Sequence, residues 1–232
     1  MAVTTIPTAT TTSSDTDRSS PPAPRDTRTR LVLAAAELVH AESYHSVGVK
    51  AICERAQVRR GSFYHFFESK QALMLEALEI AWQEFDDDVL ASCRDETLTP
   101  RRRIEAVVGS IHARQVRDQE RTGHVLGCTF GNLAAEATTL DDVIRLRLVQ
   151  VFDDWTEALE APLAEAQLAG DIDQCLTPRA AASEVLAALQ GVIVLAKTRN
   201  DPEIIAVGGP AITARLWGCS HEDRGKPRRR SP

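Results

Sequence analysis

The sequence predicts an all-α fold, and three observations support this prediction. Hydrophobic residues make up 43% of the 232 residues, only 5% are aromatic and 26% are charged, with alanine and leucine abundant. From Thr27 onward, apolar residues recur at the three- and four-residue spacing of amphipathic helices. No segment shows the alternation of a half-buried strand. Counting the periodic segments and their start signals, we expect about nine or ten helices.

The first part of the chain predicts an arm followed by four helices. Residues 1–26 are rich in Thr, Ser and Pro and offer little to bury, which is typical of a disordered arm. A first amphipathic helix is expected from Thr27 to about Ser43. Two short helices follow, over 49–56 and 61–67, separated by a four-residue turn at 57–60. Ser69 can then cap a fourth, longer helix.

Further along, start signals are clear. Thr99-Pro100, Thr177-Pro178 and Asp201-Pro202 each place a capping side chain before a proline suited to the first helical turn. A long helix is expected over 141–169 and another over 178–199. Each carries an apolar stripe, formed by Ile144, Leu148, Val151, Phe152, Trp155 and Leu159 in the first and by Ala182, Val185, Leu186, Leu189, Ile193 and Ala196 in the second.

Composition excludes several classes of protein. No stretch approaches the roughly 18–20 apolar residues that span a bilayer, and the N-terminus has no apolar segment typical of a secretory signal. The five cysteines are scattered without a CxxC pair, so we expect reduced thiols in a cytoplasmic protein. His124 and Cys128 could share a helix face, but two ligands do not make a zinc site. We therefore expect no metal, no cofactor and no membrane partner.

Charge is distributed unevenly along the chain. Residues 25–70 hold eight Lys/Arg and five Asp/Glu, a net charge of +3, whereas residues 71–220 hold 13 basic and 24 acidic residues, a net charge of −11. A small basic module joined to a larger acidic one is typical of a DNA-binding domain with a regulatory domain.

The two short helices and their turn match a minimal helix-turn-helix. Its core would hold Ala51, Ile52, Val58, Phe63 and Phe67. The second helix would present its N-terminus, with its dipole and free N–H groups, to DNA phosphate. A tight helical hairpin with a solvated basic face explains the same pattern, and periodicity does not separate the two interpretations.

The run from Val49 to Lys70 closely resembles the DNA-binding signature of the TetR/AcrR family. The most diagnostic part is Gly61-Ser62-Phe63-Tyr64-His65, then Phe67 after one variable position, followed by Ser69-Lys70. The resemblance covers roughly residues 27–75. One departure is Gln57, where the family usually has glycine, so a positive φ in the turn would be strained here.

This resemblance implies a set of DNA contacts. Tyr64 and Lys70 would contact phosphate, Lys50 would approach the flanking backbone, and bases or backbone would be contacted by Arg60, Gly61, Ser62 and His65. Arg59 or Arg60 is placed to read a guanine edge. It also implies a domain division, with the helix-turn-helix domain over 27–71, a ligand-binding and dimerisation domain over 72–217, and a basic flexible tail over 218–232.

Members of this family are two-fold dimers whose last long helices pack into a four-helix bundle. We expect the stripes of 141–169 and 178–199 to contribute to such an interface, with Ala187, Ala188 and Gly191 allowing close approach. Part of each stripe must also serve the core of its own chain. The resemblance further implies a pocket for a small-molecule inducer, with candidate lining residues Trp82, Phe85, His112, Cys128, Phe130, Phe152, Trp155 and Gln190; each could equally be a core residue.

Cys128 has two interpretations. The segment Gly127–Ala134 resembles one in the branch of the family that includes regulators responding to reactive electrophiles such as N-ethylmaleimide and aldehydes. A thiolate near His124 and a helix N-terminus could react with an electrophile. Alternatively, Cys128 is a small apolar residue between Gly127 and Gly131, which allow tight helix contact.

The function expected from this resemblance is a DNA-binding transcriptional repressor that a small-molecule inducer releases from a palindromic operator, binding double-stranded DNA as a homodimer. A ligand-free or activating helix-turn-helix regulator is the alternative. An all-α enzyme has little support, because the sequence shows no phosphate-binding glycine loop and no nucleophile–base motif.

Overall fold

The computed structural model describes residues 26–137 and 141–218. Within these ranges it contains nine α-helices, one 3-10 helix and no strand, which confirms the all-α prediction. In chain order the elements are α1 (Thr27–Ala41), α2 (Val49–Arg55), α3 (Arg60–Phe66), α4 (Lys70–Asp88), η1 (Leu90–Arg94), α5 (Pro100–Thr122), α6 (Thr129–Ala137), α7 (Asp142–Ala169), α8 (Pro178–Arg199) and α9 (Glu203–Trp217).

Side-chain caps fix most helix starts. The side chains of Ser69, Thr99 and Thr177 accept hydrogen bonds from backbone N–H groups three residues ahead, as their sequence context predicts. The third proline signal lies one residue away from the expected position. Pro202 is the N-cap of α9, and the Asp201 carboxylate accepts from the N–H of Glu203 instead.

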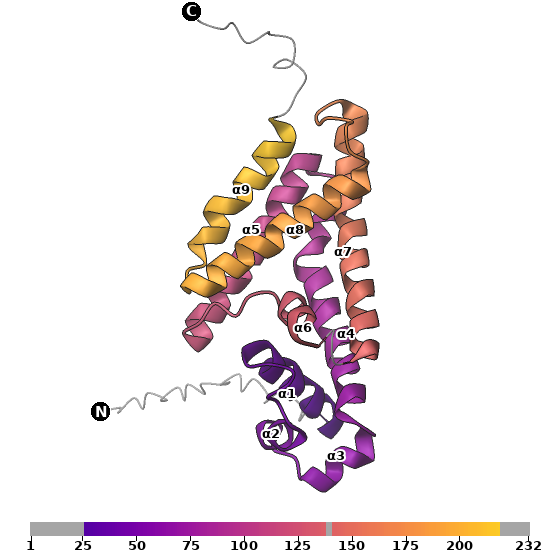
Figure 1. The fold of residues 1–232 in the computed structure, drawn as a ribbon, viewed down its shortest axis with the longest axis vertical. Helices are drawn as coiled ribbons and strands as arrows, with labels where there is room; N and C mark the ends of the chain where they lie inside the picture. The colour runs from indigo at the N-terminus through magenta and orange to yellow at the C-terminus, as the bar shows by residue number, and fades with distance from the viewer. Residues whose placement is uncertain (1–25, 138–140, 219–232) are drawn as a thin grey trace, which may run out of the picture.

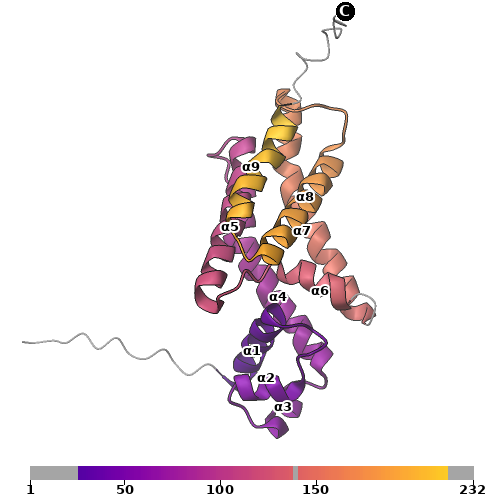
Figure 2. The ribbon, with the colours of Figure 1, turned by 60° about the vertical axis from the view of Figure 1, so that its left-hand side comes forward.

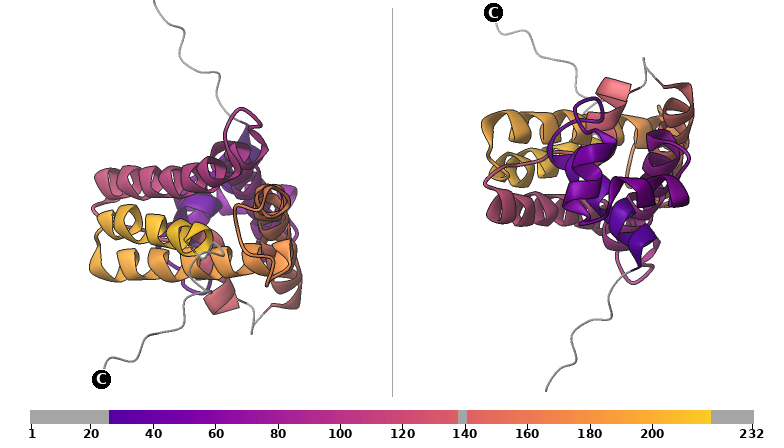
Figure 3. Two further views of the ribbon diagram at one scale, coloured as in Figure 1. Left: turned by 90° about the horizontal axis from the view of Figure 1, so that it is seen from above. Right: turned by 90° about the horizontal axis from the view of Figure 1, so that it is seen from below.

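The helices form two regions joined by one long helix (Figure 1). The short helices α1, α2 and α3 lie together at one end of the molecule, and α4 runs from them into a bundle of α5, α7, α8 and α9 (Figure 2). Seen along the long axis, the bundle helices lie side by side, while α6 lies near the junction of the two regions (Figure 3). The expected boundary between residues 71 and 72 falls in the first turn of α4. We propose the same division into two domains, with the boundary inside this continuous helix. Residues 1–25 of the expected arm and 219–232 of the expected tail lie outside the described residues, whereas Asp26, expected in the arm, caps the start of α1.

The apolar stripe of α7 is buried within the chain. Leu148, Trp155 and Leu159 are no more than 1% exposed, and α7 packs against α8 and α5. Five of its six residues are thus covered by the intrachain core, and for these the expected contribution to a dimer interface is wrong; Phe152 alone of the stripe is half-buried. The predicted stripe of α8 is buried as well, whereas Ala187, Ala188 and Gly191 on its other face are exposed.

Of the helices in the described ranges, α8 alone is long and apolar enough to cross a membrane by length and composition. Core helices of folded domains meet the same criterion, and α8 packs against α7 and α9. Only 39% of its most apolar window is buried, so an apolar face of α8 is left uncovered in the monomer.

We call the bundle of α5, α7, α8 and α9, with α6 and the second half of α4, the regulatory region, after the role expected from the sequence. Arg103 joins three parts of this region from a buried position on α5. Its side chain is only 7% exposed and forms an ion pair of 2.7 Å with Glu165 on α7. Its Nε donates to the carbonyl oxygens of Asp95 and Leu98, in the connection before α5. The carbonyl oxygen of Asp95 also accepts from the N–H of Leu98 at 3.1 Å, whereas that of Leu98 has Arg103 as its donor. The buried guanidinium thus finds the hydrogen-bond partners that a buried polar group requires.

We expect Arg103→Met to lower the free energy of unfolding by about 2–4 kcal/mol, because it removes the ion pair of a buried guanidinium and leaves the Leu98 carbonyl without its donor. The matched control is Arg102→Met. The Arg102 side chain is 73% exposed and pairs only with Glu105 on the same helix. That control should cost less than about 0.5 kcal/mol. Urea denaturation at one fixed protein concentration measures both, and equal losses would contradict the assigned role of Arg103.

Candidate nucleic-acid interface

The turn between α2 and α3 is held by backbone and side-chain hydrogen bonds. The N–H of Val58 donates to the carbonyl of Cys53, and that of Gln57 donates to Glu54. Arg30 of α1 donates to the carbonyls of both Ala56 and Gln57, with distances between 2.6 and 2.9 Å. Arg30 therefore fastens the end of α2 to α1 and fixes where α3 begins.

Gln57 adopts a left-handed conformation, with φ of 54°. This is the conformation that glycine favours, and an L-residue adopts it at a cost. The strain expected from the sequence at this departure from the family pattern is thus present in the structure.

Two phenylalanines set the orientation of α3. Phe63 is fully buried and Phe67 is 4% exposed, with ring centroids 5.9 Å apart. Tyr64, by contrast, is 57% exposed. Because the buried rings hold one side of α3 against the core, the other side of this seven-residue helix is presented to solvent at the end of the molecule (Figure 1).

The residues expected to contact DNA lie mostly on this outward side. Arg59, Arg60, Gly61, Tyr64 and His65 are exposed and Ser62 is half-buried. A Cβ added to Gly61 would have no heavy atom of the monomer within 4 Å. Gly61 also lacks a positive φ, so nothing within the chain requires glycine there. Close approach of another molecule's backbone would require glycine at this position.

The two predicted lysines have different surroundings. Lys50 is 79% exposed and lies 3.8 Å from Glu54 on the same helix. Lys70 instead donates to the carbonyl oxygen of Tyr44, and its Nζ lies 4.2 Å from the centroid of the Tyr44 ring. Burial lowers the pKa of Lys70. Lys70 is therefore engaged within the monomer, and a phosphate would have to compete with Tyr44.

Sequence reasoning missed the residues that hold this region together. Arg30 and Tyr44 act through contacts with residues distant in sequence, among them the Asp141 carboxylate, which accepts from the Tyr44 hydroxyl at 3.2 Å. Burial, together with the charge of Asp141 and the hydrogen bond to it, raises the pKa of Tyr44 to about 12. No local pattern announces such contacts. Spacing alone could not have found these residues.

Most of the candidate pocket residues lie together in the regulatory region. Trp82, Phe85 and Phe130 pack with ring centroids 5.7–5.9 Å apart, and Phe85 lies 4.5 Å from Trp155. Phe152 stacks on Trp155 at 6.4 Å. His112 lies elsewhere and faces α9, where its Nε2 is 3.2 Å from Glu203.

Two cavities meet near this aromatic group. An inner cavity of about 30 Å³ is lined by residues that include His40, Phe85, Gln115 and Trp155. An outer pocket of about 270 Å³ lies between α6, α7 and α8, and its lining includes Phe152, Gln190 and Lys197. Gly127, Cys128 and Ile193 line both. A wider cleft of about 470 Å³ between α1, α4 and α5 is lined by charged groups of both signs.

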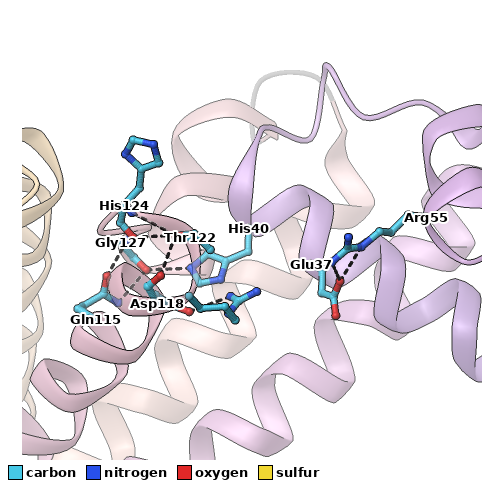
Figure 4. A network of polar contacts seen from close by, with 9 residues as sticks. Glu37, His40, Arg55, Gln115, Asp118, Thr122, His124 and Gly127 are labelled. Carbon is cyan, nitrogen blue, oxygen red and sulfur yellow. Dashed lines mark hydrogen bonds and ion pairs between the residues drawn. The ribbon is translucent and has the colours of Figure 1, made fainter.

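Cys128 lies where these two cavities meet and directly precedes α6. Burial raises the pKa of its thiol, while hydrogen bonds to Sγ from Gln190 and from the N–H of Gly131, both 3.4 Å, oppose that shift. A raised pKa means less thiolate at neutral pH. His124, expected near the thiol, is exposed and its ring points away from Gly127 (Figure 4). The reason is that α5 ends at Thr122 and Gly123 adopts φ of 80°, so no helix face joins His124 to Cys128.

Two family models match the chain. Residues 31–77 match the model described as bacterial regulatory proteins, tetR family. Residues 100–209 match the model described as tetracyclin repressor-like, C-terminal domain. The first covers α2, α3 and the strained turn, and the second covers both cavities of the regulatory region except for residues contributed by α1 and α4.

Curated relatives span most of the chain. It is 30% identical over 201 residues to the transcriptional regulator AcuR of Cereibacter sphaeroides, covering 82% of this chain and 90% of that protein. It is 28% identical over 176 residues to the HTH-type transcriptional repressor DhaR of Mycobacterium sp. (strain GP1), covering 76% and 85%. It is also 27% identical over 153 residues to the repressor NemR of Escherichia coli (strain K12), covering 66% and 72%.

The fold is likewise shared with solved structures. The regulatory protein TetR from Rhodobacter sphaeroides superposes with a TM-score of 0.73 at 27% sequence identity. The superposition covers 82% of this chain and 98% of the other.

We expect Gln57→Gly to raise the free energy of unfolding by about 0.5–1 kcal/mol, because glycine adopts the left-handed conformation without the steric cost of a Cβ. The reverse control is Gly123→Ala. Gly123 has φ of 80° and open space around its Cβ position, so this change adds strain without a clash. Urea denaturation should show opposite signs for the two variants. A loss of stability in Gln57→Gly would show that the turn carries no such strain.

Proposed function

The chain belongs to the TetR family of bacterial transcriptional regulators, and from this membership we propose that it is a DNA-binding repressor released from its operator by a small molecule. The observation that carries this proposal is the outward side of α3, which presents Arg60, Tyr64 and His65 at one end of the molecule. The regulatory region, at the other end, contains the aromatic-lined cavities. Family membership places the chain among regulators and not among enzymes.

We infer that α3 enters the major groove. Arg59 or Arg60 would read a guanine edge, and Gly61, Ser62 and His65 would contact bases or the adjoining backbone. Tyr64 would contact phosphate, with Lys50 at the flanking backbone and Lys70 reaching phosphate once it leaves Tyr44. The open space at Gly61 supports this arrangement, because a bare helix N-terminus lets DNA approach closely.

A homodimer would position two such helices. The exposed side of α8 carries Ala187, Ala188, Gly191 and Leu195, and α9 carries Val207, which is 76% exposed. Small residues on α8 allow close approach of a second copy, and a self-complementary surface of this kind suits two-fold symmetry. The separation of the two copies of α3 would then set the spacing of operator half-sites.

The inducer is proposed to bind where the two cavities meet. The outer pocket approaches the size typical of small-molecule sites, roughly 300–1,000 Å³, whereas the inner cavity is far smaller. A ligand reaching the inner cavity must therefore displace its walls. The indole N–H of Trp155 is buried without an acceptor among the described residues. A ligand that supplies a carbonyl or other acceptor would gain a hydrogen bond there.

Each of the two interpretations of Cys128, as a thiol sensor and as a structural residue, has an observation in its favour. Its position between the cavities would let an adduct disturb the packing of α6, whereas the raised pKa of its thiol favours a structural role. Activation in place of repression is the second candidate function. Two relatives that are named as repressors, DhaR and NemR, favour repression.

We expect the protein to bind DNA from just upstream of its own gene with an affinity that falls steeply with salt, because phosphate contacts release counterions. Arg60→Ala should weaken specific binding by about 1–3 kcal/mol, the cost of one lost base contact. Fluorescence anisotropy across a salt series measures both effects. The control, Arg102→Ala, removes an exposed arginine of α5 and should bind as the wild type does. Unchanged binding by Arg60→Ala would contradict the proposed placement of α3.

The dimer surface is tested by Leu195→Glu. Leu195 is 52% exposed in the monomer, so a charge there should leave the monomer folded but be costly if a second copy buries it. Analytical ultracentrifugation should then find monomers and anisotropy should find weaker operator binding. Leu168→Glu, at a residue that is 90% exposed on α7, should stay dimeric. A dimeric Leu195→Glu variant would place the interface elsewhere.

A further inference from the structure

The DNA-binding helices and the regulatory region meet at a hydrogen bond from His40. His40 lies near the end of α1, and its Nε2 is 3.1 Å from the carbonyl oxygen of Gly127, in the connection between α5 and α6 (Figure 4). A carbonyl oxygen only accepts, so Nε2 carries the proton and donates. Burial lowers the pKa of His40, although the hydrogen bond to the Gly127 carbonyl and the charge of Asp118 oppose this shift, so a neutral ring is favoured.

Gly127 is held firmly from its other side. The side-chain amide of Gln115 donates to the same carbonyl oxygen at 3.1 Å, and its Oε1 accepts from the N–H of Gly127 at 2.8 Å. Gly127 adopts φ of 83°, and an added Cβ would lie 2.9 Å from the Lys197 side chain. The peptide therefore has one well-defined position, and any displacement would be felt by His40.

This peptide also forms part of the wall between the two cavities. Gly127 and Cys128 line both of them, and His40 and Gln115 line the inner cavity. A molecule that extends from the outer pocket into the inner cavity must push against the Gly127–Cys128 segment, because the inner cavity as it stands holds only about 30 Å³.

We propose that His40 is the positioning residue through which occupancy of the cavities reaches the DNA-binding helices, by way of the carbonyl group of Gly127. Displacement of this peptide removes the acceptor of His40 and frees the end of α1. This inference rests on the proposed function and names the residue that performs its regulation.

A second hydrogen bond joins the DNA-binding helices to α6, at a point away from the cavities. Tyr44 lies just after α1 and lines neither of the two cavities. Its N–H donates to the Glu136 carboxylate at 3.0 Å, near the other end of α6. The DNA-binding helices are thus tied near both ends of α6. With the Tyr44 end retained, loss of the His40 contact would pivot α1 about α6 and tilt α3, without separating the two regions.

The test uses reciprocity, since a site coupled to DNA binding must itself respond to DNA. The probe is N-ethylmaleimide, whose rate of addition to Cys128 is followed by peptide mass spectrometry with and without the upstream DNA duplex. The exposed Cys175 serves as an internal reference for the reagent. Alkylation requires the Gly127–Cys128 segment to be displaced, so its rate follows the population of the displaced state. In the wild type, DNA should lower that population, and with it the rate of alkylation, about tenfold, a typical size for allosteric coupling.

Three variants separate the role of the hydrogen bond from simple folding. His40→Phe keeps a ring but lacks the donor, and its ratio of rates should fall to within about twofold of one. His40→Gln restores an N–H donor and should restore the ratio. His124→Phe alters the neighbouring histidine whose ring points away from Gly127, and it should behave as the wild type does (Figure 4). A full DNA effect in His40→Phe, or none in the wild type, would overturn the proposal.

A second readout needs no DNA. Alkylation of Cys128 should speed amide hydrogen exchange in α1 of the wild type, whereas His40→Phe should show fast exchange before and after the reaction. Failure of the duplex to bind would contradict the proposed function alone, while this exchange experiment still decides on His40. Equal, slow exchange in α1 of both proteins, with Cys128 alkylated, would refute the coupling.

Discussion

The structure depends on one constraint, which is that α4 must pack into both regions at once. Its first half contributes Leu73 and Met74, which are buried beside α1, and its second half contributes Phe85 to the aromatic group of the regulatory region. These residues lie in one continuous hydrophobic core. Because a helix is stiff and protein cores are close-packed, a shift of α4 at one end must be accommodated at the other. The positions of α3 and of the cavities are thereby linked through packing alone, and the hydrogen bonds at the junction act on top of this link.

Much of the fold could be predicted from the sequence, since its signals are local. Side-chain caps at Ser69, Thr99 and Thr177 and the periodic stripes place most helices within a few residues. The partner of each stripe could not be predicted. The stripe of α7 is equally suited to its own chain and to a second subunit, and only the tertiary structure shows that its own chain covers it.

In the candidate site too, local features could be predicted from the sequence and contacts between distant residues could not. The short helices and the strained turn at Gln57 follow from residues adjacent in sequence, and so does the outward side of α3. The contacts of His40, Tyr44 and Gln115 join residues that lie 87, 92 and 12 positions apart in the chain, two of them between regions. Their acceptors include backbone carbonyls, which carry no sequence signal at all. The raised pKa of Cys128 likewise reflects enclosure by distant helices, so motif spacing could not reveal it.

The uneven charge has a consequence for how the protein finds DNA. Among the described residues, 26–70 hold seven Lys/Arg and five Asp/Glu and form the end that carries α3, whereas 71–218 hold 13 basic and 24 acidic residues and form mostly the other end. The described part of the chain is therefore an electric dipole along its long axis. In the negative field of a duplex, such a dipole is turned so that its basic end leads, while the acidic bundle is repelled. Encounters are thus oriented before any contact forms, and the regulatory region is kept from lying unproductively along the phosphate backbone.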